Sequence, residues 1–227
     1  MPMKRVVATE LMDDPGVDAG ELAENFDDIE VANRHFGGVR PVVREVLASS
    51  ARSVLDVACG SGDIVRALAR AAAKRNRELR IVGLDRSDAV LRIARSRCSG
   101  APAIEFVRGD ATRLPFGDAS FDVVTCNLAL HHFEPAQAVA VLHELRRVAR
   151  IAPLVCDLER SRTSYLATVA FARLIAKNRL TKHDGPLSVK RAYTRRESVD
   201  LAHAAGWNEP VVRRSPYFRM ILSDRHA

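Results

Sequence analysis

The sequence contains no long apolar run, and this absence excludes membrane-spanning proteins. No uninterrupted stretch approaches the roughly 20 apolar residues that a helix needs to cross a bilayer. The opening residues, MPMKRVVATELMDDPG, also lack the apolar stretch and small-residue cleavage site of a secretory signal. The sequence therefore predicts a cytoplasmic protein without a membrane span.

Cysteine is scarce and its spacing is uninformative. The chain has 4 cysteines, Cys59, Cys98, Cys126 and Cys156, and no two of them form a CxxC pair. This pattern favours neither a disulfide framework nor a zinc knuckle. We expect reduced thiols that pack as small apolar side chains, and no metal site.

A concentrated basic segment is also missing, although the formal net charge is +7. The arginines are scattered over expected helix faces and loops, and the densest patches are VKRAYTRRE and VVRRS. Scattered charge is typical of a solvated surface, so nucleic acid is disfavoured as a partner.

The remaining sequence has the size and pattern of one α/β domain. A chain of 227 residues with 47% hydrophobic content can bury one full core. Apolar runs such as RSVLDVA, LRIVGLD and FDVVTCN alternate with helical patterns, which requires crossover connections and a parallel sheet covered on both faces. We find no internal repeat and no low-complexity segment.

The ends of the chain depart from this alternation. Residues up to about 50 are expected to be helical. After residue 158, a helical segment TSYLATVAFARLIAKNRL leads into an expected loop, TKHDGPLSVKRAY. Thr194 and Glu197 then match a capping box, and Gly206 matches a helix stop. Two short strands, around PVVRR and YFRMIL, are expected to close one edge of the sheet.

The stretch VLDVACGSG joins the first predicted strand to a turn with bare backbone. Gly60 and Gly62 allow N–H groups to approach a ligand, and the following helix N-terminus favours negative charge. A dinucleotide fingerprint requires a third glycine where the chain has Val65, so a nicotinamide-dependent reductase is disfavoured.

Two acids end the next two strands. Asp85 ends IVGLD, where a carboxylate can accept hydrogen bonds from both ribose hydroxyls. Asp110 follows the third strand, where an acceptor can take an adenine amino group beside the Ala111 N–H. We prefer the binding interpretation for both acids, because both strand ends face one crevice.

Together these features resemble the class I S-adenosylmethionine-dependent methyltransferases. The resemblance covers roughly residues 50 to 160 in sequential order. Within that superfamily, RLPFGDASFDVVTCNLALHHF resembles the small-molecule branch that includes ubiquinone and menaquinone biosynthesis methyltransferases. The sequence departs from the family at Ala58, where glycine is usual. The methyl group is tolerated there if the backbone φ stays negative.

The resemblance implies S-adenosyl-L-methionine as the cofactor and a Rossmann-like, doubly wound, seven-stranded sheet. The sheet is expected to be mostly parallel with a C-terminal antiparallel strand. Residues 1–50 are expected to form an N-terminal helical cap, and residues 51–227 the methyltransferase domain, with a helical lid insertion at about 160–193.

Carried over by position, the resemblance also implies a set of cofactor-binding residues. The backbone from Ala58 to Gly62 lines the methionine portion, and Asp56 either organises the turn or fixes the loop near the amino group. Arg34 is a candidate partner of the donor's carboxylate. The other implied contacts are Asp85 on the ribose, Arg86 and Ser87 bordering the adenine, Asp110 and Ala111 at its edge, and Asn127 and Leu128 by the sulfonium.

A phenol or enol acceptor must lose a proton, for which histidine is the usual base. His131 and His132 follow the fourth strand, although in many relatives a pair here only shapes the loop. His183 lies in a long segment that either forms a substrate lid or is an ordinary polar turn. Asp157 and Glu159 alone make an incomplete set for a metal-dependent catechol enzyme.

The leading hypothesis is methyl transfer to oxygen, or with less support to carbon, of a small aromatic, quinone-like or polyketide-like acceptor. The helix around Phe171 is a candidate roof for an apolar acceptor pocket. One alternative is an RNA methyltransferase, although NLAL replaces the motif such enzymes use on base amines. Another is a non-catalytic protein that binds the same nucleoside. A homodimer is left open.

Overall fold

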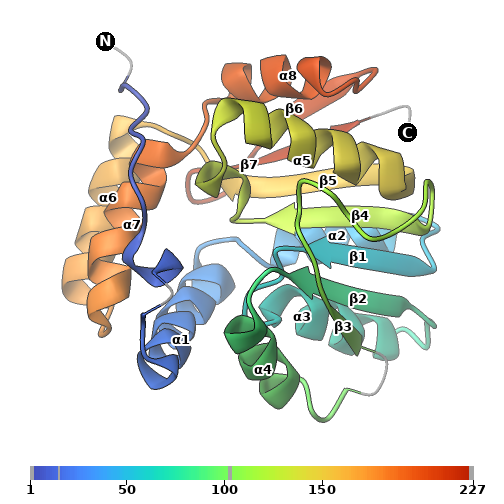
Figure 1. Cartoon of the computed structure of the whole chain (residues 1–227), viewed down its shortest axis with the longest axis horizontal. Helices are drawn as coiled ribbons and strands as arrows, with labels where there is room; N and C mark the ends of the chain where they lie inside the picture. Colours follow the sequence, from blue (N-terminus) through green and yellow to red (C-terminus); the bar gives the residue numbers. More distant parts are fainter. Residues whose placement is uncertain (1–2, 15, 102–103, 225–227) are drawn as a thin grey trace.

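The structure is a computed structural model that describes residues 3–14, 16–101 and 104–224. Its centre is a seven-stranded sheet with the order β3-β2-β1-β4-β5-β7-β6 (Figure 1). Only β7 runs against its neighbours. The strands are β1 (Ser53–Val57), β2 (Arg80–Asp85), β3 (Ile104–Arg108), β4 (Phe121–Asn127), β5 (Ala149–Leu158), β6 (Pro210–Ser215) and β7 (Arg219–Asp224).

Helices make most of the connections between the parallel strands, as crossovers require, whereas β4 follows β3 without a helix in between. The helices are α1 (Ala19–His35), α2 (Arg40–Ala48), α3 (Asp63–Ala73), α4 (Asp88–Arg97), α5 (Pro135–Val148), α6 (Arg162–Leu174), α7 (Arg179–Arg191) and α8 (Arg195–Ala204). Two short 3₁₀ turns, η1 (Leu11–Asp13) and η2 (Leu130–His132), lie near the site described below. No helix of the described part of the chain is both long and apolar enough to cross a membrane.

The sheet is buried on both faces, which explains its continuous apolar strands. Val54 packs into a cluster with α2 and α3, whereas its neighbour Leu55 packs into a second cluster with α5 and α8. Both side chains are fully buried. The predicted α/β fold, including the antiparallel strand near the C-terminus, is confirmed.

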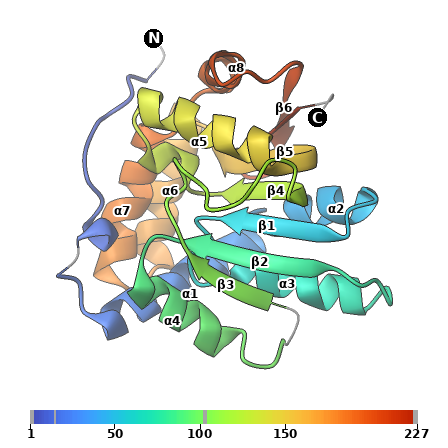
Figure 2. The same ribbon diagram turned by 45° about the vertical axis from the view of Figure 1, so that its right-hand side comes forward.

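The carboxyl ends of the parallel strands all meet at one edge of the sheet. The two views agree that α1, α6 and α7 lie beyond this edge, with the N-terminal segment running past α7 (Figures 1 and 2). The sheet therefore presents its strand ends to a helical layer rather than to open solvent.

The prediction of a loop after α6 is wrong, because this segment forms helix α7. Gly185 and Pro186 lie inside this helix. The Asn178 side chain caps its start by accepting from the Leu180 N–H at 2.8 Å, and Leu180 and Val189 are fully buried. Packing against α6 and α1 outweighs the local preference of glycine and proline for a turn.

The signals for α8 are confirmed. The Thr194 hydroxyl accepts from the Glu197 N–H at 3.3 Å, and the Glu197 carboxylate accepts from the Thr194 N–H at 2.7 Å. The helix ends at Ala204, two residues before Gly206, whose φ is 82°.

Candidate cofactor and catalytic site

A cavity of about 1880 Å³ opens at the carboxyl edge of the sheet. This volume exceeds the roughly 300 to 1,000 Å³ of a pocket for one drug-sized ligand, so there is room for two molecules. Its walls come from the glycine turn, the ends of β2 and β4, the helices α1, α6 and α7, and the N-terminal segment. The predicted residues found in the wall are Ala58, Gly60, Asp85, Arg86, Ser87, Asp110, Ala111, Asn127, Leu128, His131 and His132.

The glycine turn is closed by backbone hydrogen bonds. The Cys59 N–H donates to Leu84 O at 2.9 Å, and the Gly62 N–H donates to Cys59 O at 3.0 Å. Gly60 and Gly62 have φ values of 53° and 77°. Gly62 does not line the cavity; a Cβ there would lie 3.1 Å from Cys98 Sγ, so its role is to close the turn tightly.

Ala58 adopts a φ of 56°, so the condition under which its methyl group was expected to be tolerated, a negative φ, is not met. A residue with a Cβ is strained in this left-handed region by about 1 to 2 kcal/mol. The turn imposes this conformation because the next residue, Cys59, must bond to the end of β2. The glycine usual in the family therefore has a conformational reason at this position.

Asp85 joins the end of β2 to the turn after β1. Its carboxylate accepts from the Gly60 N–H at 3.1 Å and from the Ser87 N–H at 3.1 Å. Burial raises the pKa of Asp85, although these hydrogen bonds and the nearby Arg86 oppose the shift. The carboxylate is thus held in a fixed orientation on the cavity wall, as a ribose ligand must be.

The residues expected around the adenine are arranged by local hydrogen bonds. Asp110 Oδ1 accepts from both the N–H and the hydroxyl of Thr112, each at 2.8 Å. The Ser87 hydroxyl caps α4 by accepting from the Val90 N–H at 3.3 Å. Arg86 is paired with Asp13, with 3.2 Å between Nη2 and Oδ1. The N-terminal segment is therefore tied to this side of the cavity.

Asp56 lies behind the cavity wall rather than in it. It is 1% exposed and accepts from the Thr125 hydroxyl at 2.6 Å and from Asn127 Nδ2 at 2.8 Å. Burial raises the pKa of Asp56 to about 7. The position of Asp56 is consistent with fixing the loop near the amino group. Asp56 also holds the Asn127 side chain by its amide nitrogen, which leaves the amide oxygen of Asn127 free.

The oxygen of that amide tests whether the expected cofactor fits. Asn127 Oδ1 is buried and accepts no hydrogen bond within the described residues. An amide oxygen left unpaired in a buried site is costly unless a ligand donates to it. The ammonium group of S-adenosylmethionine is such a donor, so the residues present fit this group.

The two histidines after β4 are each held by a carboxylate. His131 is 3% exposed, and its Nδ1 lies 2.7 Å from Asp157 Oδ1. His132 Nδ1 lies 3.0 Å from Asp13 Oδ2. Burial lowers the pKa of His132, but the hydrogen bond to Asp13 and the charges of Glu10 and Asp13 outweigh it, so the net shift is upward.

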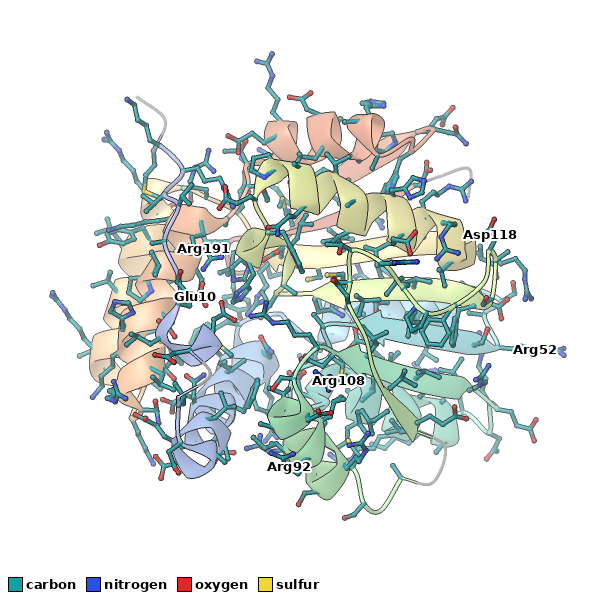
Figure 3. All side chains as sticks on the ribbon, in the orientation of Figure 1. Glu10, Arg52, Arg92, Arg108, Asp118 and Arg191 are labelled. Atoms are coloured by element: carbon teal, nitrogen blue, oxygen red, sulfur yellow. The ribbon has the colours of Figure 1, made fainter. Side chains whose placement is uncertain are left out.

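Glu10 completes this group, and the sequence analysis missed it. It is 2% exposed, accepts from the Ser188 hydroxyl at 2.9 Å, and places Oε2 3.5 Å from His132 Nε2. Figure 3 shows Glu10 and Arg191 close together beside the strand ends. No motif surrounds Glu10 in the sequence, and only the return of the N-terminal segment over α7 brings it here.

Glu10, His131 and His132 also lie close enough for their donor atoms to share a metal ion, within 4.8 Å of one another. The guanidinium of Arg191 already supplies positive charge, with Nη1 3.8 Å from Glu10 Oε1. This cation opposes a metal at the same carboxylate. Two histidines, each hydrogen-bonded to its own aspartate, are the simpler interpretation.

Besides Gly62 and Asp56, two further predicted site residues, Arg34 and His183, are absent from the cavity wall. The Arg34 side chain is 66% exposed and pairs with Glu30 at 3.0 Å, so it does not reach the donor's carboxylate. The His183 side chain is 51% exposed and bonds to Asp184 at 2.7 Å. Both predictions are corrected, because both side chains are largely exposed and neither lines the cavity.

Comparison with known proteins agrees with this geometry. Residues 54–151 match the family model described as a methyltransferase domain. Demethylmenaquinone methyltransferase of Thermotoga maritima is 40% identical over 109 residues, which make up 48% of this chain and 44% of that protein. The predicted resemblance to class I S-adenosylmethionine-dependent methyltransferases is confirmed. The match over residues 54–151 also supports the predicted enzyme class and cofactor.

Solved structures extend the likeness of fold beyond the matched segment. A SAM dependent methyltransferase from Aquifex aeolicus superposes with a TM-score of 0.67 and 16% identity, covering 91% of this chain and 97% of that one. An O-methyltransferase family 2 protein from Planctomyces limnophilus, in complex with apigenin, has a TM-score of 0.59 and 20% identity, covering 94% and 63%. The chain spans about half the length of the curated relatives it matches, so its acceptor is a matter for proposal.

Asp85 provides a direct test of the cofactor site. We expect Asp85→Asn to weaken binding of S-adenosylhomocysteine about 10- to 100-fold, because hydrogen bonds to a charged group contribute about 1.5 to 3 kcal/mol. Isothermal titration calorimetry measures the change. Asp118→Asn is the matched control, since Asp118 is 80% exposed at the opposite end of the sheet (Figure 3). Equal affinity in both variants would remove Asp85 from the site.

Proposed function

We propose that the protein methylates a hydroxyl oxygen of a small, apolar, aromatic or quinone-like acceptor. The observation that carries the proposal is that one cavity contains the cofactor residues Asp85 and Asn127, the carboxylate-held His132, and a wall of aromatic rings. When bound, the cofactor would supply an activated sulfonium methyl group to the acceptor oxygen.

His132 is proposed as the base that removes the acceptor's proton. An ionised carboxylate only accepts hydrogen bonds, so the Asp13 contact places the ring proton on Nδ1. Nε2 of the neutral ring then carries the lone pair, beside Glu10 on the cavity wall. Asp13 fixes the tautomer and stabilises the imidazolium that forms. His131, buried against Asp157, is proposed to position this loop rather than to exchange protons.

The acceptor side of the cavity is proposed to be apolar. Phe36 packs edge-on against Phe171 from α6, with 5.4 Å between ring centroids, and against Tyr217 at 5.7 Å. Leu158 and Phe218 add further apolar surface to the wall. Such a surface favours a flat, hydrophobic acceptor. The relatives named for demethylmenaquinone and the neighbour bound to apigenin support the same class.

Removing the proposed base tests this mechanism. We expect His132→Ala to lower kcat about 10²- to 10⁴-fold with a phenolic acceptor, the usual contribution of a general base. Cofactor affinity should change little. The assay is transfer of a labelled methyl group to a panel of hydrophobic phenols. His183→Ala is the control, because its side chain lies outside the cavity, and it should retain activity.

The pH profile tests the role of Asp13. Because the pKa of His132 is raised above 6.5, its basic form is lost, and kcat should fall, as the pH drops through that raised pKa. Asp13→Asn removes both the hydrogen bond and a charge that favour the imidazolium, so this limb should move to lower pH. Activity that is abolished by a chelator and restored by a divalent metal would instead assign these histidines to a metal ion.

A substitution on α6 tests whether the acceptor is apolar. We expect Phe171→Asp to lower kcat/KM for hydrophobic phenols about 10- to 100-fold, because the burial of a large apolar side chain contributes about 1.5 to 3 kcal/mol. Leu174→Asp on the same helix is the matched control, since Leu174 is 83% exposed and outside the wall. Methyl transfer to RNA but not to any phenol would favour the nucleic-acid alternative.

A further inference from the structure

Arg219 is a buried cation on the wall of the cavity that none of the steps above uses. It begins β7 and pairs with Leu158 at the end of β5, which brings it to the carboxyl edge of the sheet. The residue is 4% exposed and lines the cavity. Its position in the antiparallel strand explains why a residue so near the C-terminus reaches the strand ends of the parallel part.

The hydrogen bonds of Arg219 leave one donor group free. Nε donates to Phe36 O at 2.8 Å, and Nη2 donates to Asn33 Oδ1 at 3.1 Å. Nη1 is buried and has no hydrogen-bond partner within the described residues. No carboxylate of the described chain lies within salt-bridge distance of the guanidinium.

An unpaired guanidinium in such a place is energetically costly. Burial disfavours the charged form and lowers the pKa of Arg219, although the charges of Asp157 and Asp63 oppose this shift from beyond salt-bridge distance, and arginine stays protonated in proteins. A buried charge is retained at low cost only when it is paired and hydrogen-bonded. The two neutral acceptors, a backbone carbonyl and an amide, orient the side chain without neutralising it. An anion in the cavity would pair with this charge at closer range than Asp157 and Asp63 do.

The neighbours of Arg219 locate that anion. Asn33, which accepts from Arg219, donates from Nδ2 to Asp63 Oδ2 at 2.7 Å. Asp63 is the first residue of α3, directly after the glycine turn, and it lines the cavity. The chain of contacts leads from Arg219 to the turn that is expected to hold the amino-acid end of the cofactor. Asn127, the proposed acceptor for the ammonium group, lies on β4, with only β5 between it and β7.

We propose that Arg219 binds the carboxylate of the cofactor's methionine portion through its free Nη1 group. This deepens the proposed function and rests on S-adenosylmethionine occupying the cavity. The Asn127 oxygen then binds the ammonium group of that zwitterion, and the Arg219 guanidinium binds its carboxylate. Arg219 thus takes the role that the sequence suggested for Arg34. Asn33 and Phe36 O, at the end of α1, hold it in place.

The test compares two ligands that differ only in this carboxylate. S-adenosylmethionine and its decarboxylated form share the nucleoside, the sulfonium and the ammonium group. We expect the wild-type protein to prefer the carboxylated ligand about 10- to 100-fold in calorimetric titrations, as for a charge-assisted hydrogen bond. In Arg219→Met the two affinities should become nearly equal, through loss of affinity for the carboxylated ligand alone.

Two further variants make the outcome unambiguous. Arg34→Met, at an exposed cation on the same helix end as Asn33, should keep the wild-type preference. If Arg219→Met does not fold, Arg219→Gln removes the charge but can still donate to Phe36 O or Asn33, and it should lose the preference in the same way. An unchanged ratio in either folded variant overturns the proposal.

The remaining outcomes separate this inference from the proposed function. Equal wild-type affinity for both ligands overturns the role of Arg219 while leaving the cofactor site intact. A second outcome also overturns it: Arg219→Met keeps the wild-type preference for the carboxylated ligand but has a raised KM for an acceptor that bears a carboxylate. In that case Arg219 would bind the carboxylate of the acceptor. Binding of neither ligand by the wild type would remove the cofactor assignment and this inference together.

Discussion

The hydrogen bond from the Gly60 N–H to the Asp85 carboxylate links the two elements on which the site depends. It joins the turn after β1 to the end of β2, while the Cys59 N–H makes a parallel connection to Leu84 O. The carboxylate that is proposed to bind ribose is therefore also a structural part of the glycine turn. Its orientation is set before any ligand arrives, which reduces the conformational entropy lost on binding.

Carboxylates organise the other half of the cavity in the same way. Asp56 holds the Asn127 amide, Asp157 holds His131, and Asp13 holds His132. In each case a buried or half-buried acid determines which atom of its partner faces the cavity. Asp13 comes from the N-terminal segment, so the chemistry of the histidine loop depends on how that segment crosses the strand ends.

The helical layer of α1, α6 and α7 turns an edge of the sheet into an enclosed site. Phe26 from α1 stands over the glycine turn, where a Cβ on Gly60 would lie 3.2 Å from its ring. Phe171 from α6 meets Phe36 at the apolar side of the cavity. This layer separates the strand ends from bulk solvent, and a less polar environment strengthens the charge interactions of Arg219 and His132.

The residues of the strand ends could be predicted from the sequence, because their spacing follows from the period of a parallel α/β sheet. A strand, a turn of small residues and an acid or amide at the strand end place Asp85, Asp110 and Asn127 at one edge wherever the fold forms. The same local regularity predicted the capping box at Thr194 and the antiparallel strand at the end of the chain.

Tertiary structure decided the rest. Gly185 and Pro186 favour a turn locally, but packing of Leu180 and Val189 stabilises a helix. Glu10 and Arg219 lie near opposite ends of the sequence and meet the cavity only because the N-terminal segment and β7 both return to the strand ends. Short-range pattern carries no information about such long-range contacts, since they depend on buried packing and charge pairing between segments far apart in the chain.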